Sequence, residues 1–142
     1  MSLDNLFGVA GSALNAQTVR MNTTASNLAN AGSVASTEAE AFRAKRAVFR
    51  ALVDDALANP SAQQAVGGVK IDAVVDDQAP VRKVYQPGNP MADGDGYIYQ
   101  SNVSEVGEMV DMMAAARSYQ NNVEVINTAR QLLLKTLEAS KA

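Results

Sequence analysis

The sequence predicts an α+β fold in which long helices at the N- and C-termini pair as a coiled-coil-like domain around a small β-rich middle domain. Two observations predict the helices: the first thirty or so and the last forty or so residues carry apolar side chains at alternating spacings of three and four. A third predicts the middle, because all four Pro residues and several short alternating runs lie between these ends. We therefore expect three parts, which are residues 1–32, 33–101 and 102–142.

The first helix is expected to extend from about Asp4 to Ala29. Its seam consists of two sets of four residues, one large and apolar (Phe7, Leu14, Met21 and Leu28) and one mostly small or polar (Leu3, Ala10, Gln17 and Thr24). Such a seam lets helices approach closely but is weak alone. Asn30 and Gly32 predict the helix end, because both residue types tolerate the left-handed backbone that stops a helix. The polar residues Gln17, Thr24 and Asn27 either bond across the seam or face solvent.

The middle segment is expected to form a small sheet. Apolar and polar residues alternate over 69–76, a half-buried strand introduced by Gly67 and Gly68. Further strands are expected at 42–49, 81–86 and 97–99, and residues 51–64 fit either a short helix or a surface loop. A sheet of this size is thin for an enzyme scaffold.

The last helix has the strongest periodic pattern in the sequence. Asn102 and Glu105 resemble a capping box at its start. A helix over 103–140 is about 55 Å long at about 1.5 Å per residue, whereas a compact chain of this size is about 37 Å across, so the helix must project. Its stripe contains Met109, Met112, Ala116, Tyr119, Val123, Ile126, Arg130, Leu133 and Leu137.

The terminal helices carry more apolar surface than one helix pair can cover. Val110, Met113 and Leu134 lie off the main stripe of the last helix. Burying a large apolar side chain contributes about 1.5–3 kcal/mol, while ordering each residue costs about 1–2 kcal/mol, so helices with unburied stripes are marginal alone. The surplus predicts contacts with other subunits, and contacts between two different faces generate a helical tube when they do not close.

Composition argues against several classes of function. The chain contains neither Cys nor His, which removes disulfides, thiolate nucleophiles, the commonest metal ligands and the commonest general base. The net charge is −3, and the only basic cluster is at 43–50, so we expect no nucleic-acid partner. No apolar run approaches a bilayer span, and residues 1–5 lack the basic start of a signal peptide. We expect no catalytic residue, metal, cofactor or direct membrane insertion.

Two acidic motifs have alternative interpretations. The sequence Asp93-Gly94-Asp95-Gly96 resembles the start of a calcium loop, but Tyr97 stands where a further ligand is needed, which favours a solvated turn. Asp76 and Asp77 form a carboxylate pair, yet adjacent residues of an extended chain point to opposite sides, which favours a loop end.

Several segments together resemble the axial proteins of the bacterial flagellum, most closely those of the proximal rod. These are Ala25-Ser26-Asn27-Leu28-Ala29-Asn30, then Phe42-Arg43-Ala44-Lys45 after the insert 31–41, and the Pro-Gly-rich link 85–93 with Gly96-Tyr97. The C-terminal segments are 108–112, 117–120, 122–130 and 134–137. The resemblance covers about two thirds of the chain.

This resemblance implies a structural subunit, not an enzyme, that packs its terminal helices into the inner tube of the flagellar rod. It implies export through the flagellar type III apparatus without a cleaved signal, a location in the basal body across the periplasm, and other rod subunits and copies of itself as partners. The residues that it and the stripes assign to the assembly interface are Leu3, Phe7, Leu14, Met21, Asn27, Leu28, Asn30, Met109, Met112, Tyr119, Val123, Ile126, Arg130, Leu133 and Leu137.

Two alternatives from other classes remain at this point. A rod must pass the cell wall, which motivates a carboxylate-dependent hydrolase acting on peptidoglycan. Such an enzyme is active as a monomer and loses activity when one acid is changed. An exported coiled-coil effector is the other alternative, and it is found in the culture medium rather than in basal bodies.

Overall fold

The computed structural model describes residues 3–52 and 67–140. Its elements confirm the α+β class, with a long helix at each end and short strands between them. Most of the stretch 51–64, for which helix and loop were both open, lies outside the described residues. The elements are α1 (Leu3–Ala29), β1 (Val34–Ala35), β2 (Lys45–Ala51), β3 (Val69–Asp76), β4 (Arg82–Tyr85), β5 (Tyr97–Gln100) and α2 (Glu105–Ala139).

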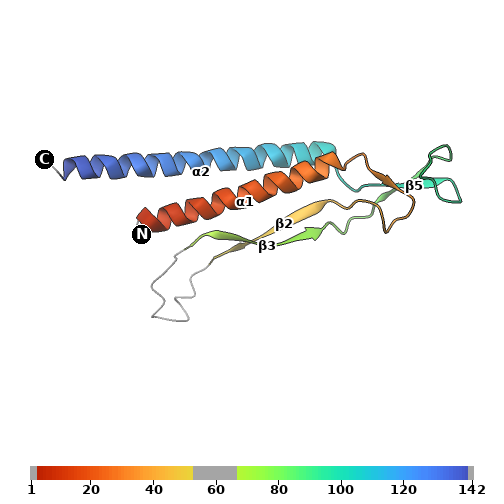
Figure 1. Cartoon of the computed structure of the whole chain (residues 1–142), viewed down its shortest axis with the longest axis horizontal. Coiled ribbons are helices and arrows are strands. Elements are labelled where there is room, and N and C mark those ends of the chain that lie inside the picture. The colour runs from red at the N-terminus through yellow and green to blue at the C-terminus, as the bar shows by residue number, and fades with distance from the viewer. Residues whose placement is uncertain (1–2, 53–66, 141–142) are drawn as a thin grey trace, which may run out of the picture.

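The two helices lie side by side and antiparallel, with both termini at the same end of an elongated molecule (Figure 1). At about 1.5 Å per residue, α1 is about 40 Å long and α2 about 53 Å. The C-terminal end of α2 therefore extends past the start of α1 (Figure 1). The projection expected from helix length is present.

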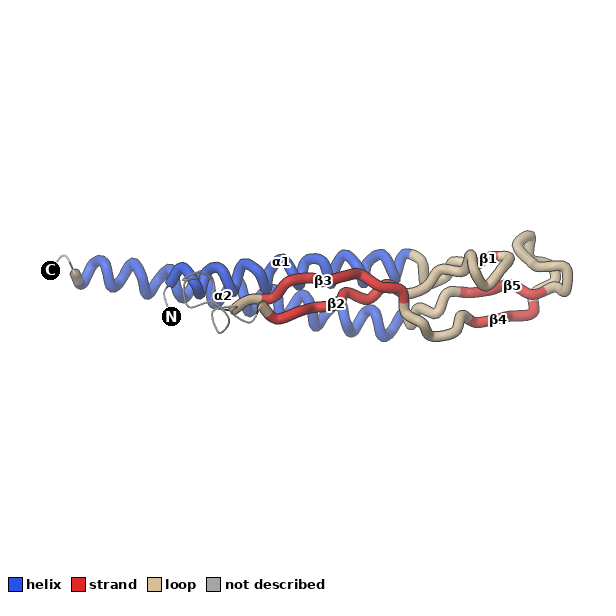
Figure 2. The backbone as a smooth tube through the Cα atoms, turned by 90° about the horizontal axis from the view of Figure 1, so that it is seen from below, coloured by secondary structure: helices blue, strands red, loops and turns tan. Residues whose placement is uncertain are grey.

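The middle segment forms two sheets rather than the single small sheet that was expected. β2 and β3 pair antiparallel as a hairpin that lies along α1, and β1, β5 and β4 form a three-stranded sheet at the far end (Figure 2). Pro80 stands between β3 and β4 and has no backbone N–H to continue a strand ladder. The chain therefore leaves one sheet before it enters the other.

β2 begins at Lys45, three residues later than the sequence predicts, because the preceding residues pack into a small core. Ala44 is completely buried there with Ala31 and Val103, and Phe42 packs against them. This core joins the end of α1, the approach to β2 and the approach to α2. It fixes how the helices are placed relative to both sheets.

Both helix ends differ in detail from the predicted signals. Ser104, not Asn102, caps α2, and its hydroxyl accepts a hydrogen bond from the backbone N–H of Gly107 at 3.3 Å. The amide of Asn102 instead bonds the backbone of three residues in the middle segment, so it is not free to cap. Gly32 does not have the positive φ expected of a left-handed cap. Asn30 directly follows the last residue of α1, and its side-chain amide donates a hydrogen bond to the carbonyl of Ser26 at 2.8 Å.

The β3 strand is more exposed than its alternating sequence predicts. Val69 and Ile71 are half-buried, but Val74 and Val75 are exposed. Within residues 3–52 and 67–140 the strand pairs with β2 alone, so the hairpin offers little surface to cover its side chains.

Gly96, just before β5, occupies a position that favours glycine. Its φ is +83°, and an added Cβ there comes within 2.9 Å of the Tyr85 ring.

Candidate assembly interface

The helix pair is built on small side chains. Ala10, Ala115 and Ala129 are buried along the helices, whereas the large seam residues of α1 are only half-buried. Small residues let helix backbones approach closely, and the larger ones then flank the contact. The half-buried residues are Phe7, Leu14, Met21 and Leu28, and the side chain of Leu3 lies outside the described part of the structure.

Asn27 ties together three elements from a completely buried position. Its amide oxygen accepts from the backbone N–H of Lys45 at 2.7 Å, and its amide nitrogen donates to the carbonyl of Lys45 at 2.9 Å. The same nitrogen donates to the carboxylate of Glu108 on α2 at 3.0 Å. Asn27 therefore bonds across the helix seam, one of the two alternatives left open by the sequence.

The other polar seam residues of α1 behave differently. Thr24 is buried, but its hydroxyl donates to the carbonyl of Arg20 within the same helix. The Oε1 atom of Gln17 is buried and has no hydrogen-bond partner among the described residues. Asn30 bonds its own helix end, so Asn27 is the residue of this group that links α1 to α2.

The carboxylate of Glu108 is the centre of a charged network at the junction of α1, β2 and α2. Its side chain is buried, and Arg46 of β2 donates to it at 2.7 Å. Arg46 also lies 3.3 Å from Asp77 and 3.8 Å from Asp111, and Asp111 accepts from Arg20 at 3.0 Å. A buried carboxylate needs such partners, because an unpaired buried charge is costly.

The network shifts the pKa values of two of its members. Partial burial lowers the pKa of Arg46, but the charge of Glu108 and the bonds to Asp77 and Glu108 outweigh it and raise that pKa. The hydrogen bond donated by the Ala79 backbone lowers the pKa of Asp77, against partial burial and with Arg46 adding to the effect. Both shifts favour the charged forms that hold β2 against the helices.

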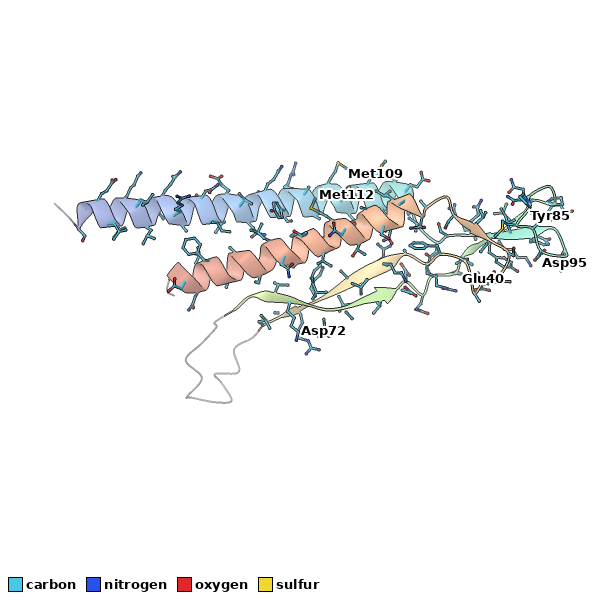
Figure 3. The ribbon with its side chains drawn as sticks, in the orientation of Figure 1. Glu40, Asp72, Tyr85, Asp95, Met109 and Met112 are labelled. Atoms are coloured by element: carbon cyan, nitrogen blue, oxygen red, sulfur yellow. The ribbon has the colours of Figure 1, made fainter. Side chains whose placement is uncertain are left out.

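The predicted stripe of α2 divides between a side facing α1 and an exposed edge. The half-buried members are Met112, Ala116, Val123, Ile126 and Leu133. Figure 3 shows the difference between neighbours, with Met112 on the α1 side of the helix and Met109 pointing away from it. The exposed members are Met109, Tyr119, Arg130 and Leu137.

The exposed apolar surface continues beyond the predicted stripe. Val110, Met113 and Leu134, expected to lie off the seam, are each at least half exposed. Val106, Val125 and Leu132 are also exposed, and the sequence pattern did not single them out. Large apolar side chains gathered on one helix of a soluble protein mark interaction surfaces.

Two of the hollows beside the helices are lined by residues of both α1 and α2. One of about 360 Å³ lies over the charged network and is lined by residues such as Arg20, Arg46 and Glu108. The other, of about 340 Å³, lies between the start of α1 and the C-terminal half of α2. Its apolar lining includes Leu6, Val125 and Leu132.

The chemistry available within the described residues is that of packing and ion pairing. Residues 3–52 and 67–140 contain no group of three or more acidic side chains that could hold a metal ion. Neither described helix is both long and apolar enough to cross a membrane. Asp93 accepts from the backbone N–H groups of Asp95 and Tyr97 at 3.0 and 2.8 Å, the geometry of a tight turn.

Sequence reasoning missed Glu108 and Arg46. Glu108 is an acid one residue before the stripe member Met109, and the helical period alone does not separate a buried acid from a solvated one. The available signal was the basic side of the strand predicted at 42–49, which contains Arg46. Pairing the two required knowledge that β2 lies along α1, where the side chain of Arg46 reaches Glu108 of α2.

Two family comparisons match the ends of the chain. The family described as "Flagella basal body rod protein" matches residues 7–32, most of α1. The family described as "Flagellar basal body rod FlgEFG protein C-terminal" matches residues 95–139, which contain β5 and α2. The two matches fall on the helices that form the candidate interface.

Curated relatives match nearly the whole chain. It is 53% identical over 137 residues to the flagellar basal-body rod protein FlgC of Salmonella typhimurium, which covers 96% of this chain and 97% of the relative. The protein of the same name from Escherichia coli O157:H7 is 51% identical over the same shares. That from Buchnera aphidicola subsp. Acyrthosiphon pisum is 44% identical, over 99% of this chain and the full length of the relative.

Proposed function

The chain belongs to the FlgC family of flagellar basal-body rod proteins and is a structural subunit of the bacterial flagellar rod, not an enzyme, and we propose that it assembles through the exposed apolar edge of its terminal helices. The observation that supports this mode of assembly is the exposure of large apolar residues along α2. Met109, Val110 and Met113 are large apolar residues of this helix, and each is more than half exposed. Burial of such residues is the principal favourable term in most protein association.

The proposed interface consists of the predicted residues on both helices. On α1 the half-buried side chains Phe7, Leu14, Met21 and Leu28 each keep part of their surface for a partner. On α2 the exposed stripe members Met109, Tyr119, Arg130 and Leu137 offer further surface along the length of the helix. Asn27 acts within the chain, because it positions α1, β2 and α2 relative to one another.

The partners we propose are other rod subunits and further copies of this chain. Contacts between different faces of related subunits continue as a helix when they do not close into a ring. A tube built in this way carries torque through helix packing. We also propose that the chain reaches the periplasmic part of the basal body through the flagellar type III export apparatus, without a cleaved signal peptide.

The experiment that tests this assembly mode places a charge on the exposed edge. Met109→Asp and Tyr119→Asp, both at exposed members of the stripe, are expected to abolish motility and to remove the protein from isolated basal bodies, because an acid cannot be buried unpaired in the contact. Circular dichroism of the purified variants is expected to show the helices retained. Motile cells with normal basal bodies in both variants contradict the proposal.

A matched control adds the same charge elsewhere on the helix. Gln120 is exposed, polar and next to Tyr119 in sequence, and Gln120→Asp is expected to leave motility intact. A peptidoglycan digestion assay on the purified chain separates the hydrolase alternative, for which activity is expected without assembly. Recovery of the chain from culture medium but not from basal bodies favours the effector alternative.

A further inference from the structure

The hairpin of β2 and β3 lies along α1 without a buried core of its own. No residue of either strand is buried. Four of their large apolar side chains are 38–48% exposed, and these are Val48, Phe49, Val74 and Val75. Apolar burial is the main source of tertiary stability, and here it acts only through half-buried residues such as Ala47, Val69 and Ile71. Polar contacts therefore have a large share in holding the hairpin in place.

The base of the hairpin is fixed beside the small core. The Asn102 amide accepts from the Ala44 N–H at 2.7 Å and donates to the Asp77 carbonyl at 3.2 Å. The Asp77 N–H also donates to the Ala44 carbonyl at 2.8 Å. Asn27 holds Lys45, the first residue of β2, through two hydrogen bonds. The chain thus enters and leaves the hairpin at one anchored point.

Beyond this base the hairpin is joined to the helices by a charged attachment and a neutral one. Arg46 donates to the buried carboxylate of Glu108 on α2 at 2.7 Å and lies 3.8 Å from Asp111. Toward the other end of the hairpin, the Val69 N–H donates to the Ser12 hydroxyl of α1 at 3.1 Å. The charged attachment is the stronger one, because hydrogen bonds between ionised groups are roughly twice as strong as neutral ones.

The two helices are joined to each other independently of the hairpin. The Asn27 amide of α1 donates to Glu108 of α2 at 3.0 Å, and Arg20 of α1 donates to Asp111 of α2 at 3.0 Å. Buried alanines on both helices add to this contact. Loss of the hairpin from α1 therefore leaves the helix pair with its own bonds.

We propose that the hairpin is a hinged arm that leaves α1 as one unit, pivoting at its base, and that the ion pair of Arg46 with Glu108 latches it. The arm belongs to the single chain and goes beyond the proposed function, because it depends on no contact between subunits. The Arg46 side chain is 42% exposed, so water can solvate its charge when the latch opens. Release uncovers the side of α1 along which the hairpin lies (Figure 2). The latch thus controls whether that side is covered by its own chain.

Hydrogen–deuterium exchange of the purified full chain, read by mass spectrometry, tests the arm. Arg46→Met removes the latch and is expected to speed exchange of the amides bonded between β2 and β3 about tenfold, because a hairpin on its own is marginally stable. Exchange in α1 and α2 is expected to stay within about twofold of the native chain. Equal acceleration in the helices overturns the arm, because the chain then opens as a whole. Unchanged hairpin exchange overturns the latch.

Arg50 provides the matched control on the same strand. Its ion pair with Asp72, at 2.8 Å, stays within the hairpin and does not reach a helix. Arg50→Met is expected to change hairpin exchange by less than about twofold, because exposed ion pairs contribute little to stability. An acceleration equal to that of Arg46→Met overturns the assignment of the latch.

A double variant separates loss of the latch from the cost of an unpaired charge. Arg46→Met alone leaves the buried Glu108 carboxylate without its cation, which weakens the helix junction as well. Arg46→Met/Glu108→Gln removes both charges and keeps an acceptor for the Asn27 amide. We expect fast hairpin exchange together with native helix exchange in this variant. Native hairpin exchange in the double variant overturns the proposal.

Salt provides a test that needs no substitution in the native chain. Raising the ionic strength from about 0.01 M to about 1 M shortens the Debye length from about 30 Å to about 3 Å and screens a partly exposed pair. Hairpin exchange in the native chain is expected to become severalfold faster, and the double variant is expected to lack this response. An equal response in both chains, or none in the native chain, overturns the latch.

Discussion

Asn27 illustrates how one buried amide can set the position of three elements. It exchanges two hydrogen bonds with the backbone of Lys45, as a neighbouring strand would, and its remaining donor capacity goes to Glu108. An amide can do this because it carries both an acceptor and two N–H donors. Its partners come from β2 and α2, so its removal leaves polar groups of both elements buried.

Asn27→Ala is expected to lower the free energy of unfolding by about 2–4 kcal/mol, because it leaves the N–H and carbonyl of Lys45 without their partner and removes one bond to Glu108. Urea denaturation followed by circular dichroism measures the change. Asn22→Ala is the matched control, since Asn22 is exposed on the same helix, and it is expected to change stability by less than about 0.5 kcal/mol. Equal effects of the two substitutions contradict the assigned role.

Residue roles were only partly predictable from the sequence. Asn27 was assigned to the interface, and the alternative of a bond across the seam was confirmed, but Glu108 and Arg46 were not identified. A helical period describes which residues share a face, not which acid meets which base. That pairing depends on where β2 lies, which is set by long-range packing around Ala44.

At the scale of elements, the helices and strands themselves follow from local chemistry. α1 and α2 end within about two residues of the predicted positions, because uninterrupted apolar periods and flanking polar residues define helices well. β3, β4 and β5 also coincide with predicted strands. What the period does not define is the partner of each strand, and the one expected sheet is in fact two.

The start of α2 gives a test at this scale. Ser104→Ala removes the cap and is expected to cost about 1 kcal/mol. Asn102→Ala removes bonds of 2.7, 2.8 and 3.2 Å to the backbone of Ala44, Ala79 and Asp77, and is expected to cost more, about 2–3 kcal/mol. Chemical denaturation of both variants measures the order. A larger loss for Ser104→Ala contradicts the assignment of Asn102 as a brace of the middle segment.

At the scale of the whole molecule, shape follows from one length. A helix of 35 residues is longer than the diameter of a compact chain of this size, so the structure is elongated, as the sequence predicts (Figure 1). The position of the hairpin β2–β3 along α1 was not predictable in this way. It depends on the bonds of Asn27 with Lys45 and on a contact of 3.1 Å between the Val69 N–H and the Ser12 hydroxyl.

Small-angle X-ray scattering of the dilute purified chain measures this shape. We expect a radius of gyration well above the value of about 14 Å for a compact chain of this length, and interatomic distances that extend past about 53 Å. The truncation that ends the chain at Leu133 removes the end of α2 that projects past α1 and is expected to shorten the longest distance. A compact, symmetric distance distribution contradicts the elongated structure.

The hairpin β2–β3 has a further consequence for the free protein. A two-stranded ladder leaves one side of each strand without a pairing neighbour, and such strand margins recruit other chains into amyloid-like stacks. Here both strands carry charged side chains, which pair across the hairpin as Lys45 with Asp76 and Arg50 with Asp72, and charged side chains on an edge strand oppose the approach of another strand. The same charges that stabilise the hairpin thus act as gatekeepers against misassociation while the subunit is still unassembled.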